Sequence, residues 1–271
     1  MELTITKNDF AQAIATPVTG LDDLFNRVQP FLPAAQRTLE KSINYTVAAI
    51  GVANAELVKE FICLTAFWQA LQNIDLIWTP SGFGVTSNNT LAPASKERVE
   101  NLRNNTLRRS IEAKYNLLDE LYTTSAYVDA QTPASFILLW SQYKKLAGEK
   151  IDAQEFDTYL YKFRSIEWKL ACLVSQAELD YLRNLAARQW LPDYAATPAQ
   201  KEAIELIELF VIGRAADITT ADELPPRILA VINDPANAAD FARYVNSSEY
   251  IANNTEPYEN THDKPTFFFS C

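Results

Sequence analysis

Glycine is scarce in this chain, and its scarcity limits the possible folds more than any other feature of the sequence. Only 6 of the 271 residues are glycine, whereas average usage of ~7% would supply about 19. Rossmann, P-loop and all-β folds place glycine at the positive φ angles of their turns. The hydrophobic fraction of 48% and the charged fraction of 21% are typical of a globular protein. The composition therefore favours an all-α fold, a bundle of many helices.

Apolar residues recur at helical spacing along most of the chain, and residues that favour helix N-termini precede several of these stretches. After Asn54, a favoured N-cap residue, one apolar stripe continues to Leu71. Capping boxes begin at Ser175 and Thr197, and Thr132 precedes a proline, which is favoured at the first helical position. These signals predict helices that begin near residues 19, 34, 54 and 95, and helices over residues 133–147, 152–170, 175–188, 198–216, 226–233 and 235–245.

The helical stretches fall into two groups. The Ser/Thr-rich stretch from Thr123 to Thr132 separates an N-terminal helical half, residues 1–125 with a long loop at 79–94, from a C-terminal helical half, residues 132–250. Residues 251–271 have a linker's polar composition, which predicts a flexible tail. Within the halves, residues 56–76 resemble residues 201–219. Either the halves arose by duplication, or two amphipathic helices resemble each other through their periodicity alone.

The residue patterns of common catalytic and metal-binding sites are missing from the sequence. The single histidine, His262, lies in the polar tail, so no Ser-His-Asp triad or histidine-based zinc site is expected on a rigid element. Gly82-Phe83-Gly84 lacks the spacing of a phosphate-binding loop. Cys63, Cys172 and Cys271 are far apart and are typical of reduced thiols. We therefore expect no catalytic residues, no cofactor and no metal ion.

The first ten residues and the hydropathy pattern bear on where the protein acts. Glu2, Lys7 and Asp9 interrupt the N-terminus, which lacks the apolar region of a signal peptide. No apolar run approaches the ~20 residues that a membrane span needs. We therefore expect a protein that is made in a cytoplasm and has no membrane partner.

Two stretches of the sequence are candidate interfaces. The stretch from Thr79 to Pro93 carries no charge, so removing it from water would cost little, and we expect Phe83, Val85 and Leu91 to contribute to a subunit interface. The tail ends in Phe267, Phe268 and Phe269, a cluster that soluble proteins rarely leave in water. For both stretches, the alternative is packing against their own chain.

A local cluster of basic residues contrasts with the net charge of −10. Six basic residues against three glutamates make the stretch from residue 96 to 114 locally positive by three. This stretch is either a solvated helix face or a surface that faces a partner or DNA. The basic residues are Lys96, Arg98, Arg103, Arg108, Arg109 and Lys114.

An aromatic cluster occurs in the second half, at Tyr159, Tyr161, Phe163 and Trp168. Aromatic residues at helical spacing more often form a core than an interface. We therefore expect these four side chains to be core residues.

One string of the sequence carries a family resemblance. GFGVTSNNTLAPASKERVENL, Gly82 to Leu102, combines a Gly-Phe-Gly-Val turn, a polar Asn-containing stretch and an Ala-Pro-Ala-Ser-Lys-Glu-Arg-Val helix start. This pattern resembles a family that Bacteroidetes prophages and crAss-like phages encode among their virion structural genes. Residues Leu21 to Ile43 also look like the helix that opens a head-tail connector domain. The string covers a small part of the chain, but the all-helical order and the aromatic C-terminus are similar too.

The resemblance implies a neck or connector ring protein that lies beneath the portal of a tailed phage. The implied partners are further copies of the chain in a homo-oligomeric ring, the portal and other neck or tail proteins, and DNA that passes without sequence-specific contacts. The implied location is the virion, after assembly in the bacterial cytoplasm. The alternatives are a cytoplasmic helical adaptor unrelated to virions, which would bind a protein or peptide through the loop, and a helical enzyme with an unfamiliar site.

Overall fold

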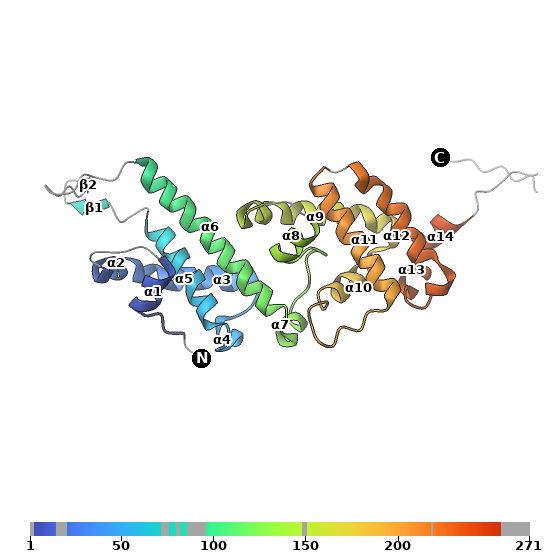
Figure 1. Cartoon of the computed structure of the whole chain (residues 1–271), viewed down its shortest axis with the longest axis horizontal. Helices are drawn as coiled ribbons and strands as arrows, with labels where there is room; N and C mark the ends of the chain where they lie inside the picture. Colours follow the sequence, from blue (N-terminus) through green and yellow to red (C-terminus); the bar gives the residue numbers. More distant parts are fainter. Residues whose placement is uncertain are drawn as a thin grey trace, which may run out of the picture.

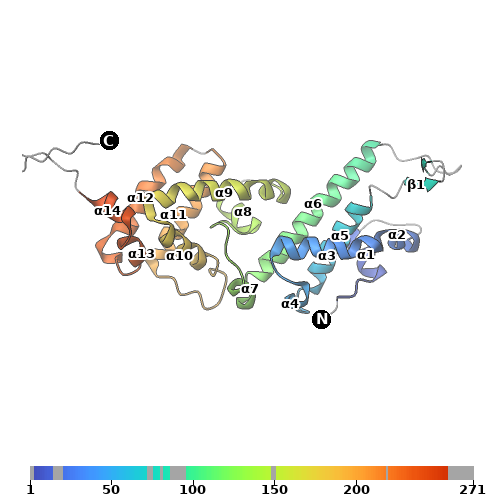
Figure 2. The ribbon, with the colours of Figure 1, turned by 180° about the vertical axis from the view of Figure 1, so that it is seen from behind.

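The computed structural model confirms the all-α fold and shows two groups of helices side by side (Figures 1 and 2). It describes residues 3–14, 21–71, 76–79, 82–85, 96–147, 151–217 and 219–255. The first group contains α1 to α7 and the second contains α8 to α14. Residues 130–139 connect the two groups without regular secondary structure, close to the predicted boundary.

The N-terminal half is built around helix α5, Ala55–Ala70. Seven consecutive residues, from Phe61 to Phe67, are buried because α1, α3 and α6 pack against different sides of this helix. Asn54 precedes the helix, as the sequence predicts. The other helical elements of this half are α1 (Lys7–Ile14), α2 (Leu21–Val28), η1 (Gln29–Phe31), α3 (Leu32–Ile43), α4 (Val47–Ile50), α6 (Lys96–Leu121) and α7 (Ser125–Asp129).

A short β-hairpin occurs where the sequence predicts only a loop. Strands β1 (Leu76–Thr79) and β2 (Gly82–Val85) pair antiparallel, with Trp78 opposite Phe83. Both strands contain aromatic and β-branched residues, and only two residues separate them, which is the spacing of a hairpin. The low overall glycine content favours helices, and the prediction followed it and not this local signal for a hairpin.

The C-terminal half is built around helix α11, Pro198–Ala215. Its predicted capping box is present: the Gln200 amide donates to Thr197 Oγ1, and the Thr197 amide donates to Gln200 Oε1. Helices α8, α9, α10 and α12 pack around α11. The elements of this half besides α11 are α8 (Trp140–Ala147), α9 (Ala153–Val174), α10 (Gln176–Ala186), η2 (Thr219–Glu223), α12 (Leu224–Asn233), η3 (Pro235–Asn237), α13 (Ala242–Val245) and α14 (Ser248–Asn254).

The prediction of a helix over residues 133–147 is wrong for its first half, because α8 begins only at Trp140. Two buried side chains bind the backbone that precedes it. Glu167 Oε1 accepts a hydrogen bond of 2.8 Å from the Phe136 amide, and Gln142 Oε1 accepts one of 2.9 Å from the Leu138 amide. Gln142 Nε2 also donates to the Phe136 carbonyl at 3.0 Å. These side-chain bonds replace helical ones and hold Phe136 and its neighbours in the core.

Three smaller differences concern the ends of the chain and the residues after Pro235. Helix α1 precedes the first predicted helix. The predicted helix over 235–245 is divided into η3 and α13. Residues Ile251 to Asn254, predicted as the start of the flexible tail, belong to α14, where Asn253 Nδ2 donates to the Leu173 carbonyl of α9 at 2.9 Å.

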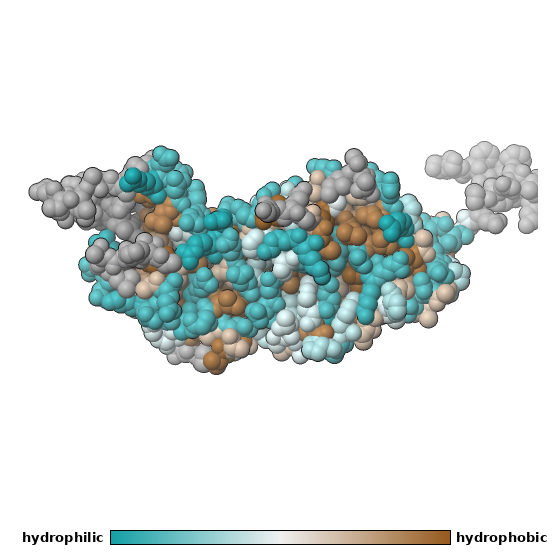
Figure 3. Space-filling model, viewed as in Figure 1, coloured by the Kyte–Doolittle hydropathy of each residue, from teal (hydrophilic) through white to brown (hydrophobic). Residues whose placement is uncertain are grey.

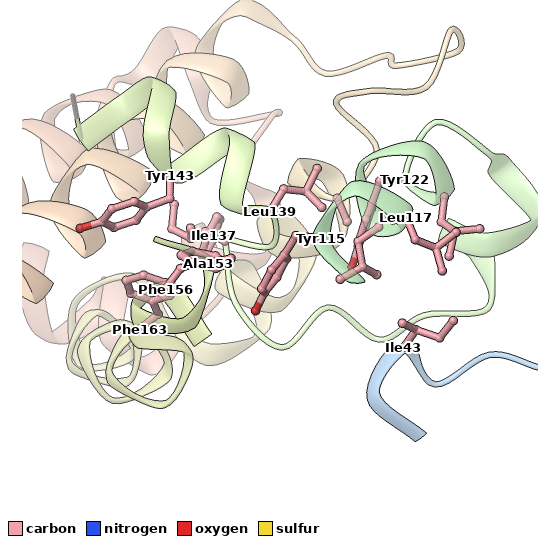
Figure 4. Close-up of a cluster of buried hydrophobic side chains, with 14 of the residues drawn as sticks. Ile43, Tyr115, Leu117, Tyr122, Ile137, Leu139, Tyr143, Ala153, Phe156 and Phe163 are labelled. Atoms are coloured by element: carbon pink, nitrogen blue, oxygen red, sulfur yellow. The ribbon is translucent and has the colours of Figure 1, made fainter. Parts of the chain in front are cut away.

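A buried contact between α6 and α9 joins the two halves. Tyr115 is 1% exposed, its ring meets the Phe156 ring edge-on at 5.0 Å, and its hydroxyl donates to Asp157 Oδ1 at 2.6 Å. Lys114 forms an ion pair with the same carboxylate. Figure 4 shows Tyr115 between Tyr122 of the N-terminal half and Phe156 of the C-terminal half. The core is therefore continuous across the junction.

A buried acid in the middle of α11 makes stability depend on pH. Glu208 is 5% exposed, and its Oε1 accepts hydrogen bonds from Gln142 Nε2 at 2.8 Å and Gln189 Nε2 at 3.1 Å. Burial raises the pKa of Glu208 from 4.5 to about 7, although the two amide donors oppose this shift. The folded state therefore holds this proton more tightly than the unfolded state does.

We expect the raised pKa of Glu208 to destabilise the protein as the pH rises from about 4.5 to about 7. The tightly held proton of Glu208 stabilises the folded state fully below the pKa of the unfolded state. This stabilisation, on the order of 3 kcal/mol in total, is lost as the pH rises through the pKa of the folded state. Urea unfolding at several pH values should show that Glu208→Gln removes this fall in stability. Glu202→Gln, at an exposed position of the same helix, should retain it. An unchanged pH profile in Glu208→Gln would contradict the assignment.

We expect Asp157→Ala to lower the free energy of unfolding by about 1–3 kcal/mol, because it leaves the buried Tyr115 hydroxyl without its acceptor. Asp157→Asn should cost less, since it keeps an acceptor oxygen. Gln154→Ala, at an exposed position one turn earlier, should change stability little. Urea denaturation of the three variants measures these differences, and equal stability of all three would show that the contact does not join the halves.

Candidate interaction surface

Helix α9 exposes two large aromatic side chains on the side that faces away from the core. Trp168 is 75% exposed and Tyr161 is 69% exposed, and their separation of seven positions corresponds to about two helical turns. Arg164 and Lys169 are exposed on the same part of the helix, and Cys172 follows one turn after Trp168. We call these five residues the α9 ridge.

The opposite side of α9 is mostly apolar, with Glu167 as its buried acid, and it fixes which way the ridge faces. Phe156, Phe163, Leu170 and Val174 recur at intervals of seven or four residues, and all four are buried. This side packs against α11 and α10, while the α6 contact covers its first turns. Because one side of the helix is bound in this way, the ridge must face solvent.

The prediction that the aromatic cluster belongs to the core is half right. Phe163 is buried, and Tyr159 is half-buried and stacks on Tyr143 with the ring centroids 6.1 Å apart. Tyr161 and Trp168 are instead exposed. The two sets have the same helical spacing, because Phe163 is seven residues from Phe156 and Trp168 is seven residues from Tyr161.

Two hollows lie beside the ridge, separated by Thr132 to Ala134 and by Arg164, which line both. The first hollow has a volume of about 480 Å³ and lies at the junction of the two halves. Its aromatic lining residues are Tyr115, Tyr122, Tyr127 and Tyr161. The second has a volume of about 570 Å³ and lies between α9 and α10, with Trp168 among its lining residues. Both volumes lie within the range of small-molecule and side-chain sites.

The polar groups of the two hollows are largely bound to one another. Burial raises the pKa of Tyr115, and burial alone raises that of Tyr122 to about 12, so both hydroxyls remain protonated near neutral pH. In the second hollow, Arg183 Nε donates to Glu167 Oε2 at 3.1 Å. Arg164 forms no ion pair within the described part of the chain. Among the charged lining residues of the two hollows, Arg164 is therefore the one that is available to a partner.

A second surface, which we call the α11–α12 groove, lies on the C-terminal half. Figure 3 shows apolar side chains gathered over α11 and α12 on the face seen in Figure 1. The groove has a volume of about 320 Å³, and Glu223 and Arg227 are its charged lining residues. Its other lining residues are Leu146, Ala147, Leu209, Ile212, Gly213, Ala221 and Leu224.

The α9 ridge and the α11–α12 groove lie on opposite faces of the C-terminal half. Helix α9 crosses in front of α11 and α12 in Figure 2, whereas α11 and α12 lie in front in Figure 1. The apolar side of α9 is turned toward α11, so the ridge points away from it. The chain therefore presents two different partly apolar surfaces in opposite directions.

The structure places few of the predicted interface residues in described regions. Phe83 and Val85 lie in β2, at the end of the N-terminal half that is farthest from the junction. Leu91 and Phe267 to Phe269 lie outside the described residues. The role of these residues in a subunit interface stays a prediction.

The sequence did not predict the ridge or the groove as a surface.

The six predicted basic residues do not form one free surface. Arg109 donates to the Ala13 carbonyl at 2.6 Å, which binds the last turn of α1, and Lys114 pairs with Asp157 across the junction. The Arg103 guanidinium lies 5.4 Å from the centroid of the Trp68 ring. Arg108 is exposed and bonds Asn105 and Glu112 on its own helix, and Arg98 is exposed too. Lys96 begins α6, and nothing is described of its side chain.

The remaining buried acids of the C-terminal half bind internal partners. Glu178 Oε2 accepts a hydrogen bond of 2.9 Å from the Tyr244 amide, and Glu167 binds Ser135, Phe136 and Arg183. Burial raises the pKa of both acids. Among the described residues, no group of three His, Cys, Asp or Glu side chains could hold a metal ion. The same residues include no helix that is long and apolar enough to cross a membrane.

Comparison with known proteins gives one match, which covers less than half of the chain. Residues 16–136 match the model of a family of unknown function, DUF6712. The matched part includes α2 to α7 and the hairpin and ends within the segment that connects the two halves. No curated protein and no solved structure matches the chain. Over residues 16–136, the chain is therefore similar to that family.

Proposed function

We propose that the protein is a structural component of a tailed phage, a head-tail connector or neck ring protein beneath the portal, and that it acts by forming a homo-oligomeric ring. Its partners in this proposal are further copies of the same chain, the portal and other neck or tail proteins. DNA would pass through the ring without sequence-specific contacts. The location in this proposal is the virion, and no catalytic step is involved.

The observation that carries this proposal is the presence of two unlike surfaces on opposite faces of one half. A contact between different patches of identical subunits is heterologous, and it generates a ring when the rotation between neighbours closes. The α9 ridge combines aromatic and basic side chains, whereas the α11–α12 groove is mostly apolar, with one acidic and one basic residue in its lining. Exposed tryptophan and tyrosine are frequent hot spots of protein interfaces.

Two further observations support the choice of a phage connector among ring-forming proteins. The string from Gly82 to Leu102, which resembles the virion family, lies within the part of the chain that matches a family model. The net charge of −10 would also keep DNA from adhering to the wall of a channel. The structured basic residues of α6 are largely engaged within the chain, which fits DNA that passes without being held.

The proposal predicts that the purified chain assembles into closed rings, either alone or together with the proteins encoded beside it. Native mass spectrometry should give one dominant mass that is a whole multiple of the subunit, and negative-stain images should show rings. A chain that stays monomeric at all concentrations and joins no particle would contradict the proposal and favour the adaptor. Turnover of a small molecule would favour the enzyme.

The residues first identified in the sequence allow a second prediction about assembly. Val85→Asp in β2, and deletion of Thr266 to Cys271, should each reduce the fraction of subunits in rings, because each removes apolar surface from a candidate interface. The melting temperature of the isolated subunit should change little. If a variant instead melts much earlier and assembles normally, that segment packs within its own chain.

A further inference from the structure

We infer that the α9 ridge of one copy occupies the α11–α12 groove of the next copy, and that this contact closes the ring. The inference rests on the proposed function and names the surfaces through which that assembly would occur. The occupant of the groove is thus a second copy of this chain, through Trp168 and Tyr161.

The ridge has a composition that suits a partner with apolar and acidic character. From residue 158 to 173, the exposed residues of α9 include no aspartate or glutamate, although the chain as a whole is strongly acidic. Arg164 and Lys169 are exposed there, and neither forms an ion pair among the described residues. The ridge therefore offers two aromatic rings and two uncommitted positive charges.

The groove complements the ridge in polarity, because it offers apolar surface to the aromatic rings while its own charged lining residues, Glu223 and Arg227, balance each other. Its floor includes Leu209 and Ile212, which are half-buried and buried, respectively. Glu223 lines the groove, and the exposed Glu205 lies one turn before Leu209 on α11. The volume of about 320 Å³ lies near the lower end of the range for binding pockets, which suits an aromatic side chain. The basic lining residue, Arg227, can lie over the face of an inserted ring.

The geometry allows the two surfaces to meet only between copies. The ridge and the groove face opposite directions on one packed group of helices, so a chain cannot bring its own ridge into its own groove. A pair of copies joined by one such contact retains a free ridge at one end and a free groove at the other. A contact of this kind continues from copy to copy until the ring closes.

The test uses two full-length variants that each lose one surface. Trp168→Ala combined with Tyr161→Ala removes the ridge and leaves the groove, whereas Leu209→Glu places a charge in the groove and leaves the ridge. Each variant alone should bind its neighbours roughly 30-fold or more weakly and remain monomeric where the unmodified chain forms rings. Gln154→Ala, exposed on α9 outside the ridge, should assemble normally.

Mixing the two variants gives the decisive result. In the mixture, the Leu209→Glu variant retains an intact ridge, and the variant with Trp168→Ala and Tyr161→Ala retains an intact groove, so the two can bind each other. The resulting pair has no other intact surface. Native mass spectrometry should therefore show one-to-one heterodimers and no larger species. Rings formed by both single variants, or a mixture that remains monomeric while both variants are folded, would overturn the inference.

Chemical crosslinking keeps the inference testable if Leu209→Glu impairs folding. Cys172 lies one turn from Trp168 and is exposed, whereas Cys63 is buried. In a Cys271→Ser background, Arg227→Cys at the groove should crosslink to Cys172 of another copy and give a ladder of multimers. Ala126→Cys, exposed on α7, serves as the control and should give none. The absence of a ladder with Arg227→Cys would contradict the contact.

Three outcomes separate this inference from the function on which it rests. An unmodified chain that stays monomeric at all concentrations and joins no particle would overturn both. Rings that persist when the ridge is removed would overturn the inference and leave the connector proposal in place. Rings that persist without the ridge but disappear on deletion of Thr266 to Cys271 would show that the C-terminal phenylalanines, and not α9, hold the neighbours together.

Discussion

The arrangement of the C-terminal half depends most on the hydrogen bonds and the ion pair that the Glu167 carboxylate forms. This side chain is 1% exposed, and it binds the Phe136 amide and Ser135 on one side and Arg183 of α10 on the other. It therefore fixes the connecting segment and α10 on the same helix, α9. An ion pair at this depth is costly unless its hydrogen bonds are complete, so the three partners are needed together.

The position of Glu167 also determines which residues of α9 are exposed. Trp168 is the next residue along the helix and is 75% exposed, because a rotation of about 100° separates successive side chains. Turning α9 so that the indole became buried would move Glu167 and Phe163 out of the core. The exposed aromatic ridge is thus a consequence of how firmly the other side of the helix is bound. It leaves apolar surface in water that a partner can cover.

Each half has one central helix, which explains the resemblance between two parts of the sequence. Helices α5 and α11 lie within residues 56–76 and 201–219 almost entirely, and neighbouring helices surround both. A helix in that position must be apolar on most sides, so similar sequences follow from similar surroundings. The helices around them differ: α6 is the longest helix of the N-terminal half, whereas short helices follow α11. Duplication therefore stays a hypothesis.

The sequence alone determined the helical class, the positions of α5 and α11 and the capping box at Thr197, because these features follow from local spacing and from the backbone preferences of single residues. It did not reveal that residues 133–139 are not helical, because the side chains that bind this backbone lie outside it: Glu167 is distant in sequence, and Gln142 is in the following helix. Nor could spacing show which aromatic residues of α9 are exposed. Phe163 and Trp168 both fit a helical stripe, and only the packing of α9 against its neighbours decides which stripe is buried. Local backbone and side-chain preferences decide which segments form helices, whereas burial against distant segments decides how each helix is rotated and what it contacts. The candidate surface results from that packing.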